Sequence, residues 1–379
     1  MKKLEQYIER PASAITGKKN LEHLYTLQDF PVFMGCVDAS QDGDLIADMV
    51  WDICKDTGII QLRNLIPLEV LYLNQHNEGI GKVWTEHYLE FCKFLKKYDP
   101  HSVLEIGGAH GLIAKNFIEV SPDTSWVIVE PNPTFAGNEK IKVIRNWFDD
   151  KFSLGERVDT VVHSHVLEHT YDPVSYLNHV SSFLRNGDRH IFTFPNMREQ
   201  LVRKYTNCLN FEHTVFLTEY FVDYLLERFG FKILEKQYFQ DHSIFYATEK
   251  LDVVTDITLI SKYDEYKKLF MEFAGYHLNM VKELNEKINS SNLPVYLFGA
   301  HIFSQYLLGF GLDTDKIVSV LDNSPTKQGK RLYGTRFKVE SPKVLAGKGP
   351  VNIILKAGIY NEEIKKDILE NINEKVEFW

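Results

Sequence analysis

The sequence predicts an α/β protein built around a doubly wound, mostly parallel sheet, with a small N-terminal segment before it and a second α/β unit after it. Three observations lead to this prediction. Residues 103–111 (VLEIGGAHG) combine a short apolar run with a glycine-rich turn and lead into helical spacing. Strand-like and helix-like segments then alternate up to about residue 250, which is typical of a parallel sheet with helices on both faces. A similar alternation returns after residue 293.

Composition narrows the class of protein. The 379 residues exceed one ordinary core, so we expect two or three domains. The net charge of −9 argues against a nucleic-acid partner. No apolar run approaches the roughly 20 residues of a membrane span, and the first residues, MKKLEQYIERP, lack the apolar stretch of an export signal. The four cysteines form no CxxC pair, which favours reduced thiols and a cytoplasmic protein.

The first segment, residues 1–75, is expected to be a small, loop-rich cap with little core of its own. We predict only a strand at 59–62 and a helical turn at 68–73. Small caps of this size often need a metal ion. The candidates Cys36, Cys54 and His23 do not have the spacing of metal ligands, so we expect no metal.

The second segment, residues 76–250, is expected to form the central sheet. It begins with a polar hinge at 76–81 that includes His76 and Asn77, and this hinge is either a connector or a lid that contacts substrate. An amphipathic helix at 84–95 follows. Apolar runs predict strands at 103–106, 126–130, 141–144, 158–162, 189–194, 231–238 and 243–248. Helices are predicted from Asp172 to Leu184 and from Thr218 to Gly230.

The third and fourth segments are a long connecting helix within residues 251–292 and an α/β unit at 293–379. In the last unit we predict strands at 295–298, 317–321 and 351–355 and helices at 303–310 and 362–372. Its single Gly299-Ala300 turn has no third glycine, which favours a structural or substrate-side role over a dinucleotide site of its own.

The turn after the first central strand indicates a nucleotide site. Glycines there let a ligand approach the backbone, and free N–H groups wait at the start of the following helix. The spacing, however, departs from the G-x-G-x-x-G pattern of NAD enzymes. An acid lies inside the strand, and the turn matches the first motif of class I S-adenosylmethionine (SAM) methyltransferases at Glu105, Gly107, Gly108, Ala109 and Gly111. In that family the acid faces the methionine amino group, directly or through water.

Further donor-binding residues are predicted at the ends of the next strands. Glu130 ends the second strand, where an acid suits the two hydroxyls of a ribose. Asp149 or Asp150, after the third strand, could instead contact the adenine amino group or be an ordinary loop acid. The backbone of His165, after the fourth strand, is expected to line the methyl-donor pocket. Two neighbours that open a helix are expected to be structural: Glu168 and His169.

A polar pair, Glu212 and His213, lies among apolar residues beyond the fifth strand. If the chain is extended here, the two side chains point to opposite faces and do not pair with each other. One could then face the pocket while the other braces a loop. A histidine has the side chain best suited to take a proton near neutral pH, although the residues alone also allow a buried structural histidine.

Several motifs together resemble the three-domain sugar C-methyltransferases, which act on nucleotide-linked deoxysugars. The resemblance spans about residues 50–375 and rests on VLEIGGAHG, SHVLEHTYDP, NFEHTVFLT, YLFGA and LDNSPTKQGKRLYGT. It implies a zinc-binding N-terminal domain, a Rossmann-like class I methyltransferase domain that binds SAM and a Rossmann-like C-terminal domain. The zinc cysteines are mostly gone, so the first domain is of a degenerate zinc type. His213 falls on the catalytic histidine of the family's Tyr-x-Glu-His segment, and Asn210 stands in place of the tyrosine.

The resemblance implies a SAM-dependent methyltransferase whose acceptor is a sugar, carried on a nucleotide. His213, with Glu212, would be the general base that prepares a carbon next to a ketone for methylation. Contacts to this substrate are expected from His76, Asn77, Asn196 and Asn210. The alternatives are O-methylation of a sugar or another small molecule, and, in a different class, a NAD-linked enzyme or a non-catalytic sugar-nucleotide binder. The sequence does not predict an oligomeric state.

Overall fold

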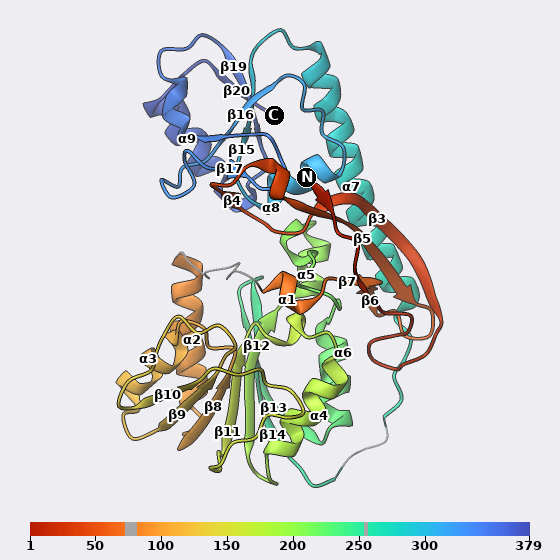
Figure 1. Ribbon diagram of the computed structural model, residues 1–379, viewed down its shortest axis with the longest axis vertical. Helices are drawn as coiled ribbons and strands as arrows, with labels where there is room; N and C mark the ends of the chain where they lie inside the picture. The colour runs from red at the N-terminus through yellow and green to blue at the C-terminus, as the bar shows by residue number, and fades with distance from the viewer. Residues whose placement is uncertain (73–81, 254–256) are drawn as a thin grey trace.

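The computed structural model describes residues 1–72, 82–253 and 257–379. A seven-stranded sheet lies at one end of the long axis and a five-stranded sheet at the other, and the N-terminal strands run alongside the long helix α7 between them (Figure 1). The predicted hinge at 76–81, with His76 and Asn77, lies outside the described residues. No helix in the described part of the chain is both long and apolar enough to cross a bilayer.

The seven-stranded sheet has the order β10-β9-β8-β11-β12-β14-β13. Its strands are β8 Ser102–Ile106, β9 Ser125–Val129, β10 Ile141–Ile144, β11 Thr160–Ser164, β12 Arg189–Pro195, β13 Phe231–Phe239 and β14 Ser243–Lys250. The first five are parallel, and β14 is antiparallel to both of its neighbours. The predicted doubly wound fold is confirmed, with β11 starting two residues later than expected. Strand order reverses between β8 and β11, and ligands of such sheets bind outside the carboxyl ends at this point.

Both faces of this sheet are covered by helices. Successive residues of β8 point to opposite faces, so Val103 belongs to one core cluster and Leu104 to another. The first face packs against α2 Lys82–Lys96 and α3 Leu112–Val120, and the second against α4 Pro173–Phe183 and α6 Glu219–Arg228. The start of α4 is fixed by its cap, because Asp172 Oδ1 accepts a hydrogen bond from Ser175 N at 2.9 Å.

The N-terminal segment is not loop-rich, and that prediction was wrong. It contains two long antiparallel strands, β3 Leu21–Pro31 and β5 Leu45–Cys54. Register shifts between His23 and Tyr25 and between Leu27 and Phe30 interrupt the alternation along β3, which hides the strand from pattern reading. The predicted strand and turn are present as β6 Ile60–Leu62 and α1 Leu68–Leu71; the short pieces are β1 Lys2–Lys3, β2 Ile8–Glu9, β4 Cys36–Val37 and β7 Asn64–Leu65.

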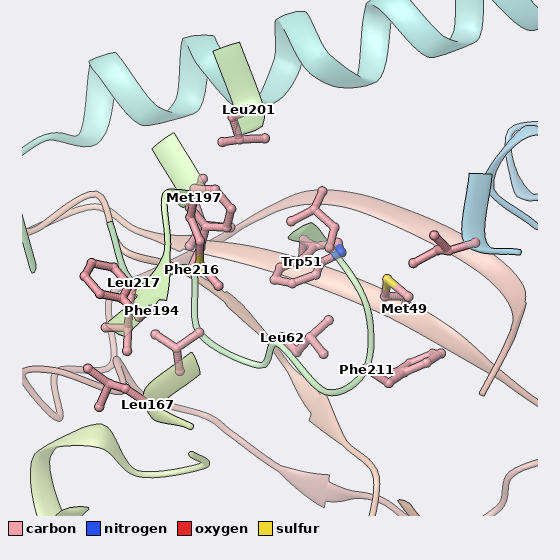
Figure 2. Close-up of a cluster of buried hydrophobic side chains, with 14 of the residues drawn as sticks. Met49, Trp51, Leu62, Leu167, Phe194, Met197, Leu201, Phe211, Phe216 and Leu217 are labelled. Atoms are coloured by element: carbon pink, nitrogen blue, oxygen red, sulfur yellow. The ribbon is translucent and has the colours of Figure 1, made fainter. Parts of the chain in front are cut away.

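The N-terminal sheet shares its core with the central part of the chain. Met49, Trp51 and Leu62 pack with residues of the 209–217 segment and of α5 Met197–Val202, beneath α7 (Figure 2). Backbone bonds join the two segments, from Leu62 N to Thr214 O and from Phe216 N to Ile60 O. The segment that carries Glu212 and His213 is therefore held by the N-terminal sheet.

The C-terminal part begins with α7 Tyr263–Ser290, twelve residues after the start that we expected for the connecting segment. A five-stranded parallel sheet of order β18-β16-β15-β19-β20 follows. Its strands are β15 Val295–Phe298, β16 Ile317–Leu321, β18 Val339–Glu340, β19 Val351–Leu355 and β20 Val376–Phe378; the helices are α8 Ile302–Gly309 and α9 Asn361–Asn371. The short strand β17 Arg331–Leu332 pairs with β4 and ties this part to the N-terminal segment.

Candidate active site

The turn between β8 and α3 has no room for side chains at its glycines. Gly107 and Gly111 have φ values of +76° and +64°, which L-residues with a side chain seldom adopt. A Cβ at Gly107 would lie 2.6 Å from Val166 Cγ2, and one at Gly111 would lie 2.5 Å from the Phe135 ring. The turn is closed by Gly111 N, which donates to Gly108 O, and Ala109 O accepts from Thr134 N. The packing around the turn therefore requires glycine, and the helix start that follows suits the polar end of a nucleotide-type ligand.

Glu105 lies beneath this turn rather than on its surface. Its side chain is 2% exposed, and Oε2 accepts a hydrogen bond from Trp126 Nε1 at 2.8 Å. A Cβ at Gly108 would come within 2.7 Å of Glu105 Oε1. Burial raises the pKa of Glu105 to about 7, and the Trp126 bond acts in the opposite direction. The carboxyl group therefore braces the turn from below.

Glu130 directly follows β9, next to the glycine turn. Gly107 N donates to Val129 O at 3.0 Å, which places the two strand ends side by side. Glu130 Oε1 accepts from Asn132 N at 2.8 Å, and burial raises the pKa of this carboxyl group. The hydrogen bond from Asn132 N engages Oε1, so Glu130 Oε2 can accept a hydrogen bond from another donor.

Asp149 and Asp150 are exposed in the loop after β10. Asp149 Oδ1 accepts from Lys151 N at 3.0 Å, a bond within its own turn. Both aspartates also act electrostatically on His179 of α4. These contacts are compatible with both predicted roles of the two aspartates, an adenine contact and an ordinary loop acid.

Two acids and two histidines meet beyond the carboxyl end of β11. His169 Nδ1 lies 3.7 Å from Glu212 Oε2, and His169 Nε2 lies 4.0 Å from Glu168 Oε1. The rings of His169 and His213 are 4.9 Å apart and edge-to-face. Glu168 and His169, which we expected to be structural, therefore belong to the same cluster as Glu212 and His213. The only signal in the sequence was their position at a strand's carboxyl edge.

A turn at Asn210 explains why Glu212 and His213 both reach His169. Asn210 Oδ1 accepts from Glu212 N at 2.8 Å and from His213 N at 2.9 Å. The chain bends here, so the extended conformation on which the opposite-face prediction depended is not present. Asn210 is 5% exposed and its side chain is engaged in the turn.

Burial shifts the pKa values of the two acids in this cluster toward neutral pH. It raises the pKa of Glu168 and of Glu212 to about 7 each, and it lowers the pKa of His169 to about 4. Near pH 7 His169 is therefore uncharged, and the two carboxyl groups can each hold or release a proton. Within the described residues, His169 Nδ1 and both Glu168 oxygens are buried and form no hydrogen bond, so the cluster holds titratable groups close together without a connected path for protons.

His165 follows β11 in a left-handed conformation, with φ of 53°. Its N–H donates to Thr193 O at 2.9 Å, and its Nδ1 lies 3.1 Å from Glu168 Oε1, although the contact is not aligned as a hydrogen bond. Asn196, partly buried at the end of β12, donates its backbone N–H to His242 O at 3.0 Å. Two predicted residues, His165 and Asn196, therefore line the carboxyl edge of neighbouring strands.

Comparison with known families identifies two domains. Residues 80–236 match the model of a methyltransferase domain, and residues 249–378 match that of a C-methyltransferase C-terminal domain. The first match contains the glycine turn, Glu130 and the histidine cluster. No curated protein matches the chain.

Solved structures that resemble the chain include three methyltransferases. An O-methyltransferase family protein from Burkholderia thailandensis is 9% identical, with a TM-score of 0.36, over 45% of this chain and 57% of that one. The N-methyltransferase NodS from Bradyrhizobium japonicum, in complex with S-adenosyl-L-homocysteine, is 15% identical over 45% and 89%, with a TM-score of 0.36. Human N-acetylserotonin methyltransferase, in complex with SAM, is 17% identical over 44% and 56%, with a TM-score of 0.36. The chain thus spans little more than half of two of these proteins.

Proposed function

Because the chain is a SAM-dependent methyltransferase, we propose that it methylates a carbon next to a ketone in a sugar carried on a nucleotide. The observation that carries this proposal is the cluster of Glu168, His169, Glu212 and His213 at the carboxyl edge of the sheet. The match of residues 249–378 to a C-methyltransferase C-terminal domain favours carbon over oxygen as the acceptor atom. The resemblance to sugar C-methyltransferases provides the acceptor class.

The donor pocket is proposed to lie over the glycine turn. The methionine end of SAM would rest on the backbone at residues 107–111, the turn that leads into α3. Glu130 would accept hydrogen bonds from the ribose hydroxyls, and Asp149 would contact the adenine. The backbone of His165 would close the pocket beside β11. SAM supplies a methyl group on a positively charged sulfonium, and its transfer removes that charge.

The histidine cluster is proposed to prepare the acceptor carbon. His213 removes a proton from the carbon next to the ketone, and the electron pair left on that carbon forms the new bond to the methyl group. The proton taken from the carbon stays on the His213 ring, which lies against His169 beside the Glu212 carboxyl group. A general base of this kind typically contributes about 10²–10⁴-fold to the rate. Asn210 positions the base by holding the backbone of Glu212 and His213.

The proposal is tested with His213→Gln in the full chain. We expect turnover to fall by about 10²–10⁴-fold, while the affinity for SAM measured by calorimetry stays within a factor of about three. The matched control is His101→Gln. The His101 side chain is 79% exposed, and the residue directly precedes β8, at the amino ends of the parallel strands. The substrates are nucleotide-linked keto-sugars, and methyl transfer is followed as S-adenosyl-L-homocysteine formed.

A second measurement separates carbon from oxygen chemistry. In D₂O without SAM, the wild-type protein should exchange the proton of the acceptor carbon for deuterium, and His213→Gln should not. Full turnover of the variant would remove His213 from the base role. A product that carries the new methyl group on oxygen would overturn the assignment to carbon while leaving the methyltransferase activity in place.

A further inference from the structure

Three histidines from separate parts of the methyltransferase domain meet beside the carboxyl ends of β11 and β12. His87 lies on α2, His165 follows β11, and His242 lies in the turn between β13 and β14. One ring nitrogen of each lies within 4.8 Å of one ring nitrogen of each of the other two. His87 is fully buried, with 0% exposure. Sequence spacing could not reveal this group, because 78 and 77 residues separate its members along the chain.

Each of these rings has a nitrogen that contacts an oxygen of a neighbouring side chain. Metal-bound histidines almost always have such a contact, because it fixes the ring orientation and the tautomer. Two of these contacts are hydrogen bonds: His87 Nε2 with Thr193 Oγ1 at 3.2 Å, and His242 Nδ1 with Ser243 Oγ at 2.5 Å. The third, His165 Nδ1 with Glu168 Oε1 at 3.1 Å, is close but is not aligned as a hydrogen bond.

The other nitrogen of His87 is buried, and nothing in the described part of the chain forms a hydrogen bond with it. A buried polar atom without a partner is costly unless it has a ligand. His165 Nε2 now contacts Ser243 Oγ at 2.9 Å. That hydroxyl also contacts His242 Nδ1, so His165 Nε2 can exchange it for an ion while Ser243 keeps its second contact.

Aromatic side chains pack around the three histidines. The Trp84 ring lies 4.8 Å from the His165 ring and 4.7 Å from the His242 ring, both edge-to-face. Phe239 and Phe245 lie 5.4 and 5.2 Å from the His87 ring.

We propose that His87, His165 and His242 bind a divalent transition-metal ion, with zinc as the ion that fits best. Neutral imidazoles suit zinc and its neighbours and do not suit calcium or magnesium. Three histidines leave the fourth position of a tetrahedral ion open. The backbone of His242 lies at the carboxyl edge of the sheet, because Asn196 N donates to His242 O. This proposal departs from the expectation of no metal, which considered only ligand spacing in the N-terminal segment.

A second group in the same domain could also hold an ion: Glu168, His169 and His213. We favour the three-histidine group because the other one contains the proposed base, His213. The two groups share no member, so variants can tell them apart.

The test measures metal uptake by the full chain without a histidine tag. After treatment with a chelator, the protein is titrated with Co²⁺ and then Zn²⁺, and bound metal is counted by mass spectrometry. We expect one ion per chain, with the visible absorption of tetrahedral cobalt, and loss of both signals in His242→Gln and in His165→Gln. His101→Gln and His213→Gln should keep them. Thr193→Val, which removes only the contact to His87, should weaken binding by about 10–100-fold.

Three results would overturn the proposal. The first is no stoichiometric uptake by the wild-type protein. The second is uptake that survives in folded His242→Gln and His165→Gln proteins, with folding checked by circular dichroism. The third is loss of the ion in His213→Gln alone, which would assign it to the other group. If a histidine variant does not fold, Thr193→Val decides, since unchanged affinity in that variant contradicts the site.

Discussion

Glu130→Gln should weaken the binding of SAM by about 10–150-fold. A hydrogen bond to a charged group contributes about 1.5–3 kcal/mol, and each 1.4 kcal/mol corresponds to a factor of ten in affinity. The substitution removes the charge and keeps the size of the side chain. The bond from Asn132 N at 2.8 Å can persist with an amide oxygen as acceptor, so the turn after β9 should be preserved.

The assay is calorimetric titration of the full chain with SAM, with Glu119→Gln as the matched control. Glu119 is exposed near the end of α3, in the same domain and away from the glycine turn. A second readout is pH. Burial raises the pKa of Glu130, and the backbone bond from Asn132 and the charge of His110 act in the opposite direction. The carboxylate is charged above this pKa, so wild-type affinity should fall as the pH drops through it, whereas the Gln variant should lack this dependence.

Two outcomes would refute the reasoning about Glu130. One is an affinity for SAM equal to that of the wild-type protein, which would mean that the ribose is held elsewhere. The other is the same fall of affinity toward acid pH in both proteins, which would assign the titration to a different group. If Glu130→Gln lowers both the affinity for SAM and the melting temperature, the substitution has damaged the turn. The Glu119→Gln control should keep the wild-type melting temperature.

Two other substitutions test the turn and the link between the first and last parts of the chain. Gly107→Ala should abolish SAM binding and destabilise the protein by at least about 1–2 kcal/mol, because φ is +76° and the new Cβ would meet Val166 at 2.6 Å. Gly155→Ala is the control, since the space around Gly155 is open, and it should change neither the affinity nor the stability. Normal SAM binding by Gly107→Ala would contradict the assignment of the glycine turn to the donor pocket. Arg331→Ala should cost about 3–5 kcal/mol in denaturant unfolding, because it strips the buried Asp44 of a two-bond ion pair with distances of 2.6 and 2.8 Å. Arg336→Ala is the control, since Arg336 is exposed and its side chain donates to Thr314 O without an acidic partner in that bond. A loss below about 1 kcal/mol in Arg331→Ala would show that other contacts compensate Asp44.

The central sheet was predictable because each of its strands has a local signature. Runs such as 126–129 are apolar on both faces, and glycine or proline marks their ends. The strand β3 has no such signature, since its bulges shift the alternation and expose polar residues on both sides. Its position is fixed by pairing with β5, and that pairing is a long-range contact that local patterns do not encode.

The site was predictable only where it depends on one strand end. The glycine turn and Glu130 each follow a strand directly, so the position of the strand gives the position of the residue. The contact of His169 with Glu212 joins residues 43 positions apart, and it requires the bend at Asn210. The approach of His87 to His165 and His242 likewise depends on how α2 packs against the sheet. No regular sequence spacing predicts any of these contacts.

The N-terminal segment also has a specific part in the arrangement of this site. Arg10, 8% exposed, donates from Nη1 to Thr214 O at 2.8 Å and from Nη2 to Tyr171 O at 2.5 Å. Its guanidinium therefore joins the loop that follows His169 to the segment that follows His213. Leu62 N donates to Thr214 O and fixes the same segment from the N-terminal sheet.

These contacts give the N-terminal segment a structural role at the site. A guanidinium with five donors in a rigid plane can hold two backbone carbonyls at a fixed separation, and burial strengthens both bonds because water does not compete. The two carbonyls belong to Tyr171 and Thr214, which follow His169 and His213 closely in the chain, so the bonds from Arg10 hold these two segments side by side. Together with the bond from Leu62 N in β6, they fix the segment that carries Glu212 and His213 to the N-terminal sheet.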